Sequence, residues 1–170
     1  VYSFERREDF AKIAQKNVTN FFRELPTNWQ VTLGDLQEKV LQLPQASVDR
    51  VVLDMLAPWE TIDSIANVLR PGGVVIAYVA TTTQMSRFVE DLRTDKRWTD
   101  PEGQELIQRP WHLEGLAVRP NHRMQGHTGF LVTARRLAPG VVLPTRRIRP
   151  TKGQLDTVAE SSSEAGEESS

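Results

Sequence analysis

Cysteine is absent from this 170-residue sequence, and so is any long apolar segment. Without cysteine the chain can form neither a disulfide framework nor a thiolate metal site. No apolar run in it approaches the roughly 18 residues that indicate a membrane-spanning helix. The first residues, Val1-Tyr2-Ser3-Phe4-Glu5, match neither a signal peptide nor an initiator sequence. We therefore expect the chain to start inside a longer protein.

The net charge is only −1, but the charges are unevenly placed. Residues 1–140 hold 17 basic and 17 acidic side chains, residues 141–152 hold four bases and no acid, and residues 153–170 hold five acids and no base. The acidic end cannot bury enough apolar surface to fold. The basic stretch suits either a solubilising linker or a phosphate contact. We expect a folded domain over 1–139, a basic linker over 140–152 and a disordered acidic tail over 153–170.

Apolar periodicity predicts strands that alternate with helices along most of the chain. The expected strands are 1–4, 29–33, 48–53 and 74–79, and the expected helices lie within 10–25, 58–69 and 85–92, with a tight turn at 70–73. Two later strands, 106–118 and 128–135, are joined by a loop at 119–126. This order predicts an α/β fold with a doubly wound, Rossmann-like sheet and a C-terminal antiparallel hairpin.

Three acids, Glu5, Asp35 and Asp54, stand at the carboxyl ends of predicted strands, where open α/β sheets bind ligands. A single acid in such a place is more often a helix cap or turn former. Glu5 could accept from both hydroxyls of a ribose, which suits a nicotinamide dinucleotide or S-adenosylmethionine equally well. Asp35 could accept from an adenine amino group, and Asp54 would then lie beside the reacting atoms.

A further pattern consists of Leu53-Asp54-Met55-Leu56-Ala57-Pro58-Trp59-Glu60, Leu69-Arg70-Pro71-Gly72-Gly73, Ala77-Tyr78-Val79 followed by Thr83-Gln84, and Gly126-His127-Thr128-Gly129-Phe130-Leu131-Val132. These blocks resemble the tRNA (adenine-58-N1) methyltransferases of the single-polypeptide bacterial and archaeal type. The resemblance covers about residues 1–139. Its first and last blocks are specific, whereas the Pro-Gly-Gly turn is shared by many methyltransferases.

The resemblance implies a cytoplasmic class I methyltransferase that takes S-adenosylmethionine as cofactor and methylates N1 of adenine 58 in the T-loop of tRNA, usually as a homotetramer. By position, Glu5, Asp35 and Asp54 match cofactor-binding acids, and Asp54 also matches the catalytic acid. Tyr78 matches a catalytic aromatic residue of the target-base pocket. Phe10 falls where the family has a cofactor contact, although its periodicity alone indicates the core. His127 is placed near the substrate.

Adenine N1 chemistry suits these residue types. The N1 lone pair needs no general base, and methylation makes the ring cationic, so a carboxylate such as Asp54 can stabilise the developing charge. An aromatic side chain such as Tyr78 can receive a base that leaves its stack. We expect no metal, because His112, His122 and His127 fit no ligand spacing. The alternatives are a nicotinamide-dependent oxidoreductase and a non-catalytic tRNA-binding subunit.

The glycine-rich loop that such folds place between their first strand and first helix has no counterpart here, because Gly72-Gly73 precedes a strand. In this fold the first strand lies at the centre of the sheet, so its absence would leave two strand edges unpaired. We therefore expect the chain alone to fold poorly and to bind S-adenosylmethionine weakly or not at all.

Overall fold

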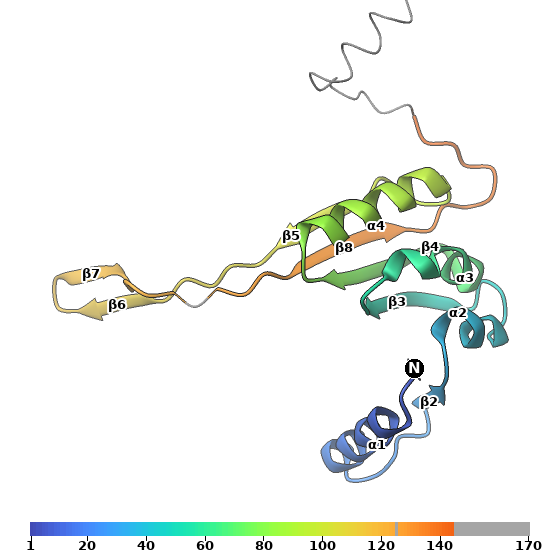
Figure 1. Cartoon of the computed structure of the whole chain (residues 1–170), viewed down its shortest axis with the longest axis horizontal. Helices are drawn as coiled ribbons and strands as arrows, with labels where there is room; N and C mark the ends of the chain where they lie inside the picture. The colour runs from blue at the N-terminus through green and yellow to red at the C-terminus, as the bar shows by residue number, and fades with distance from the viewer. Residues whose placement is uncertain (125, 145–170) are drawn as a thin grey trace, which may run out of the picture.

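The structure, a computed structural model, describes residues 1–124 and 126–144. The acidic tail and most of the basic linker lie outside these residues. The elements in chain order are β1 (Tyr2–Glu5), α1 (Glu8–Phe22), β2 (Gln30–Leu33), α2 (Leu36–Lys39), η1 (Val40–Gln42), β3 (Val48–Asp54), η2 (Pro58–Thr61), α3 (Ile62–Val68), β4 (Leu69–Val79), α4 (Thr82–Asp95), β5 (Glu102–Glu105), β6 (Trp111–Glu114), β7 (Ala117–Pro120) and β8 (Phe130–Arg135) (Figure 1). The predicted alternation of strands and helices is confirmed.

The core lies between a four-stranded sheet and two helices. The sheet has the order β3-β4-β8-β5, with β3 parallel and β8 antiparallel to β4. Side chains alternate along a strand, and one face of this sheet packs against α3 and α4. The buried cluster includes Leu53, Ile65, Val75, Ala77, Phe88, Leu92 and Val132. On the opposite face Val52 is 71% exposed, so the described residues cover the sheet on one side only.

We predicted a tight turn at residues 70–73 before a strand at residues 74–79. The prediction of the turn was wrong, because residues 70–73 belong to the strand β4. β4 begins at Leu69, and its register against β3 jumps from Val48–Leu69 to Arg50–Val74, which makes the intervening residues a bulge. The amide of Gly72 (φ 79°) donates to the Arg136 carbonyl at 2.7 Å. Pairing with the chain after β8 therefore holds this segment in the sheet, although the backbone bends at Gly72.

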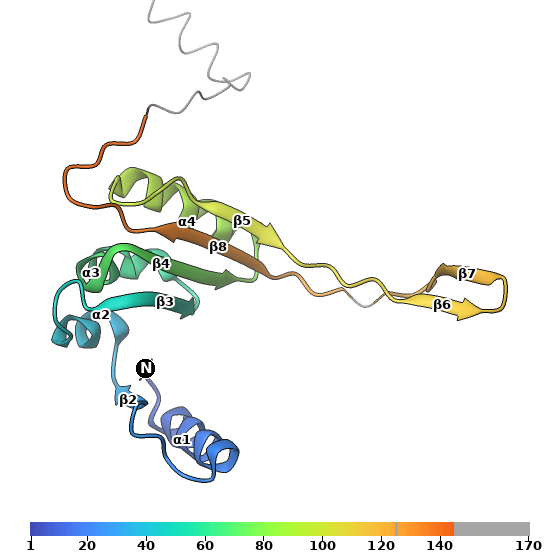
Figure 2. The same ribbon diagram turned by 180° about the vertical axis from the view of Figure 1, so that it is seen from behind.

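The first part of the chain forms a separate small unit. β1 and β2 pair in parallel as a two-stranded sheet, and α1 connects them. No backbone ladder among residues 1–124 and 126–144 joins β1 to β3, and the two sheets lie apart in Figures 1 and 2. We expected two strand edges to be left unpaired, and this is confirmed in the described residues, where β1 pairs only with β2 and β3 only with β4.

The helix α1 ends at Phe22, earlier than its apolar pattern predicted, because Arg23 adopts a left-handed conformation with φ 69°. The face that we predicted to be core is largely open in the described residues. Phe10 is 44% exposed and Phe21 is 79% exposed. Phe10 is thus not a core residue here, and the Arg7 guanidinium lies 3.4 Å from the centre of its ring.

The predicted late strand at 106–118 and the loop at 119–126 were wrong. The chain reverses after Glu114 through Gly115, whose φ is 52°, and residues 117–120 form a second strand. β6 and β7 make a two-stranded antiparallel hairpin that projects far from the main sheet (Figures 1 and 2). The hairpin at the sheet itself is formed instead by β5 and β8.

No helix of residues 1–124 and 126–144 combines the length and the apolar character needed to cross a membrane.

Candidate active site

Asp54 and Tyr78 lie opposite each other at the carboxyl ends of two neighbouring strands. They are the last register pair of the parallel β3–β4 ladder. Asp54 follows the buried Leu53, and Tyr78 lies between the buried Ala77 and Val79. Because paired residues project from the same face, both side chains lie on the face away from the core. Asp54 is exposed and Tyr78 is half-buried, so a ligand can approach both.

Gly129 leaves room for the Tyr78 ring because glycine has no Cβ atom. Tyr78 pairs with Leu131 of β8, and Gly129 immediately precedes that strand. A Cβ atom at Gly129 would lie 2.8 Å from Cε2 and 2.9 Å from Oη of Tyr78, closer than real Cβ contacts allow. The glycine is therefore required by the position of the ring. The specific Gly-His-Thr-Gly block of the sequence thus contacts the candidate target-base residue.

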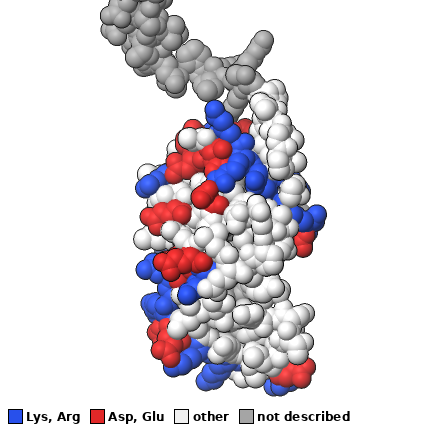
Figure 3. Space-filling model, turned by 90° about the vertical axis from the view of Figure 1, so that its right-hand side faces the viewer, with Lys and Arg blue, Asp and Glu red and all other residues white. Residues whose placement is uncertain are grey.

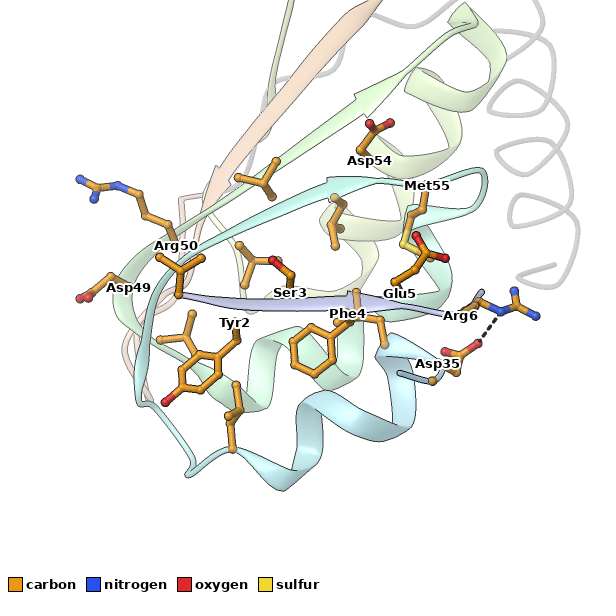
Figure 4. Close-up of a pocket in the computed structure, with 18 of the residues that line it drawn as sticks. Tyr2, Ser3, Phe4, Glu5, Arg6, Asp35, Asp49, Arg50, Asp54 and Met55 are labelled. Atoms are coloured by element: carbon orange, nitrogen blue, oxygen red, sulfur yellow. Dashed lines mark ion pairs between the residues drawn. The ribbon is translucent and has the colours of Figure 1, made fainter. Parts of the chain in front are cut away.

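A cavity of about 800 Å³ lies between β1 and β3. Its lining includes Glu5, Asp35 and Asp54, which Figure 4 shows at the same end of the cavity, whereas Tyr2 and Arg50 lie toward the other end. The structure thus brings the three sequence-predicted acids to one place. Tyr78 lies one strand further along and does not line this cavity.

Two of the acids already make contacts with the chain. Glu5 Oε1 accepts a hydrogen bond from the Arg7 amide at 2.9 Å. Asp35 is the N-cap of α2, where Oδ1 accepts from the Gln37 amide at 2.9 Å, and its Oδ2 lies 3.5 Å from Arg6 Nε. Asp35 therefore has the helix-capping role that is common for an acid after a strand. Glu5 keeps one carboxylate oxygen without a hydrogen bond among the described residues.

The other predicted site residues lie elsewhere. Phe10, on α1, and His127, in the segment before β8, do not line the cavity, and His127 is exposed. His112 lies on the hairpin, 3.5 Å from Glu114. Among residues 1–124 and 126–144 no group of three or more His, Asp or Glu side chains could hold a metal ion.

The surface charge is mixed. On the face drawn in Figure 3, Lys and Arg alternate with Asp and Glu along one side, and a broad area carries neither. The ion pairs of this chain, such as Lys12–Glu8 and Arg70–Asp49, are mostly exposed. This face therefore has no continuous basic surface for a polyanion.

Gln84 lies in one of the quoted sequence blocks, but the sequence pattern predicted no site role for it. Its side chain contacts Leu56, Ala80 and Thr81 next to the candidate site. The available signal was the spacing Thr81-x-x-Gln84, which forms a capping box at the start of α4. That pattern predicts the cap and gives no sign of the contact with Leu56.

Comparison with known proteins shows which enzymes this chain is similar to. No family model matches the chain. The tRNA (adenine(58)-N(1))-methyltransferase TrmI of Thermus thermophilus is 30% identical, over 80% of this chain and 51% of its own length. The tRNA (adenine(57)-N(1)/adenine(58)-N(1))-methyltransferase TrmI of Methanocaldococcus jannaschii is 27% identical, over 79% of this chain and 55% of its own length. The chain thus spans about half the length of these curated relatives.

Solved structures support the same relationship. The tRNA (m1A58) methyltransferase TrmI of Aquifex aeolicus has 26% identity and a TM-score of 0.70, covering 81% of this chain and 53% of that one. A SAM-dependent O-methyltransferase of Thermotoga maritima has 27% identity and a TM-score of 0.69, covering 88% and 51%. The chain therefore has the class I methyltransferase fold and is a relative of the tRNA (adenine-58-N1) methyltransferases that spans about half of their length.

Proposed function

We propose that residues 1–139 are part of a methyltransferase domain that transfers a methyl group from S-adenosylmethionine to N1 of adenine 58 in tRNA. The observation that carries the proposal is the pairing of Asp54 with Tyr78 at the strand ends, with Asp54 also lining the cavity that contains Glu5. The similarity to the Thermus and Aquifex enzymes supports the tRNA substrate. A nicotinamide-dependent reaction has no support in these comparisons.

In this proposal Asp54 and Tyr78 handle the target base. Tyr78 provides an aromatic surface for an adenine that has left its stack. The Asp54 carboxylate accepts a hydrogen bond from the adenine amino group and stabilises the positive charge that develops on the ring as N1 gains a methyl group. Since N1 has a free lone pair, no side chain has to remove a proton from it before the transfer.

The residues around the cavity suit the cofactor in part. S-adenosylmethionine supplies the methyl group when bound. The free Glu5 oxygen can accept from a ribose hydroxyl, because a carboxylate is an acceptor only. Asp35 would have to exchange its Arg6 contact for the adenine amino group, since both its oxygens have partners. A cofactor contact of Phe10 would require Arg7 to leave its ring.

The exposed hairpin supports the proposed homotetramer. Directly opposed residues share a face, so Trp111, Leu113, Val118 and Pro120 line one face, and His112, Glu114, Ala117 and Arg119 line the other. Trp111 is 53% exposed and Leu113 is 73% exposed. A two-stranded hairpin with an open apolar face is marginal by itself, and contact with other copies would cover this face. The proposal also places His127 near the substrate. It places the protein in the cytoplasm, where tRNA is available.

Methylation of defined tRNA transcripts tests this function. The full-length protein is incubated with S-adenosylmethionine and a transcript, and 1-methyladenosine is located by mass spectrometry of nuclease fragments. We expect the modified base at position 58 and none in a transcript in which guanine replaces that adenine. Tight tRNA binding without methylation would instead favour the non-catalytic subunit.

A further inference from the structure

The side-chain amide of Gln84 joins the two loops that leave the candidate active site. Nε2 donates to the Leu56 carbonyl at 3.0 Å, and Oε1 accepts from the Ala80 amide at 3.2 Å and the Thr81 amide at 3.1 Å. Gln84 itself lies in the first turn of α4, whose N-cap is Thr81, and is half-buried. One rigid planar group therefore connects the loop after β3 to the loop after β4.

The two connected residues lie equally far along the chain from the candidate active-site residues. Leu56 follows Asp54 by two residues, and Ala80 follows Tyr78 by two. The Asp54–Tyr78 pair is the last of the β3–β4 ladder, so backbone pairing between the strands ends there. Beyond that pair, the Gln84 amide is the next hydrogen-bonded connection between the two chain segments in the described residues.

We propose that Gln84 is a positioning residue that fixes the separation of Asp54 and Tyr78, a role that rests on the proposed function. If the loops moved apart, the carboxylate and the aromatic ring would no longer meet the same adenine. A displacement of about 1 Å in a reacting geometry can reduce a rate about 100-fold. Gln84 touches neither substrate nor cofactor in this account and acts only through the two strand ends.

The alternative is that Gln84 serves only the helix cap. In a capping box the third residue of the helix needs an acceptor oxygen, which glutamine and glutamate provide equally well. Donation to the Leu56 carbonyl needs the amide nitrogen, which glutamate lacks. Gln84→Glu therefore keeps the cap and removes the connection, whereas Thr81→Ala weakens the cap and keeps the connection. Gln84→Met, which has similar length and no charge, removes both.

The test measures steady-state kinetics and backbone hydrogen exchange on the full-length protein and these three variants. For Gln84→Glu we expect kcat for tRNA methylation to fall at least about 10-fold, with KM for both substrates within about 3-fold. Exchange in residues 55–59 should accelerate, while the Ala80 and Thr81 amides keep their protection. Thr81→Ala should keep kcat within about 2-fold, and Gln84→Met should lose activity as Gln84→Glu does.

Two results would overturn the proposal. One is a kcat in Gln84→Glu and Gln84→Met that equals the wild-type value. The other is an equal loss in Thr81→Ala, which would make the cap the important contact. If the wild-type protein methylates no tRNA, the proposed function fails. Hydrogen exchange then tests by itself whether Gln84 connects the two loops. Unchanged protection of residues 55–59 in Gln84→Glu would refute that connection.

Discussion

The Tyr78 ring lies against the backbone of Gly129, where a Cβ atom would be 2.8 Å from Cε2 and 2.9 Å from Oη. Tyr78 is on β4, and Gly129 immediately precedes the antiparallel neighbour β8. The position of the ring therefore depends on a glycine 51 residues further along the chain. A side chain at Gly129 would push the ring out of its present place.

We predict that Gly129→Ala weakens the target-base step. The displaced ring should lower kcat/KM for tRNA about 10-fold and leave S-adenosylmethionine affinity unchanged, because Gly129 does not line the cavity between β1 and β3. Gly126→Ala is the matched control, since nothing lies within 4 Å of a Cβ atom there. Equal kinetics in both variants would show that the Tyr78 position is unimportant.

For Glu5 we predict a role in cofactor affinity. Glu5→Gln replaces a charged acceptor, and hydrogen bonds to charged groups contribute about 1.5–3 kcal/mol. Cofactor binding to the full-length protein, measured by calorimetry, should weaken about 10- to 100-fold. Glu8→Gln removes a similar charge from an exposed ion pair with Lys12 and should leave the affinity unchanged. Unaltered binding in Glu5→Gln would exclude the ribose contact.

The predictable part of this structure is its local pattern. Strand and helix periodicity placed the elements around Asp54 and Tyr78 correctly, because their buried faces follow simple alternation. The bulge before Val74 could not be predicted, since it depends on pairing with Arg136 from the far end of the chain. The reversal at Gly115 could have been found from the glycine, although the apolar residues on both sides of it favoured one long strand.

The candidate site was also predictable only where it depends on the local sequence pattern. The three acids were predicted from their places at strand ends, and all three line the same cavity. Asp35 caps α2, and helix capping is one of the two roles, beside ligand binding, that an acid at a strand end can have. The contacts of Gln84 with Leu56 and of Gly129 with Tyr78 could not be predicted, because each joins residues that are distant in sequence.

The 170-residue chain by itself should be unevenly stable. The unit of β1, α1 and β2 has no backbone ladder to the main sheet in the described part of the chain, and Phe21 and Phe22 are 79% and 56% exposed. Local units with few buried contacts open at low free energy. Hydrogen exchange should be fast in residues 2–33 and slow in β4 and β8. Uniform slow exchange would contradict this description.

Cofactor binding by the same isolated chain should be weak. Glu5 belongs to the loosely attached unit and Asp54 to the main sheet, so a ligand that contacts both must first order them. We expect calorimetry with S-adenosylmethionine to give no saturation at micromolar concentrations. Micromolar affinity would show that the two parts already hold the cofactor site together.

The apolar face of the hairpin should control assembly. Leu113→Glu places a charge at the centre of that face, opposite Val118, and should reduce a tetramer of the full-length protein to smaller species in analytical ultracentrifugation. Arg119→Glu, on the polar face, changes charge at a neighbouring position and should not alter the mass. A tetramer that persists in Leu113→Glu would assign the interface to another surface.

Single-turnover methylation of tRNA by the full-length Asp54→Ala protein tests whether Asp54 acts on the target adenine. Removal of a group that stabilises developing charge costs about 100- to 1,000-fold in rate. We expect a loss of that size at saturating enzyme, with tRNA affinity within about 3-fold of the wild-type value. A wild-type rate in Asp54→Ala would contradict the account, because no other acid in the described residues pairs with Tyr78.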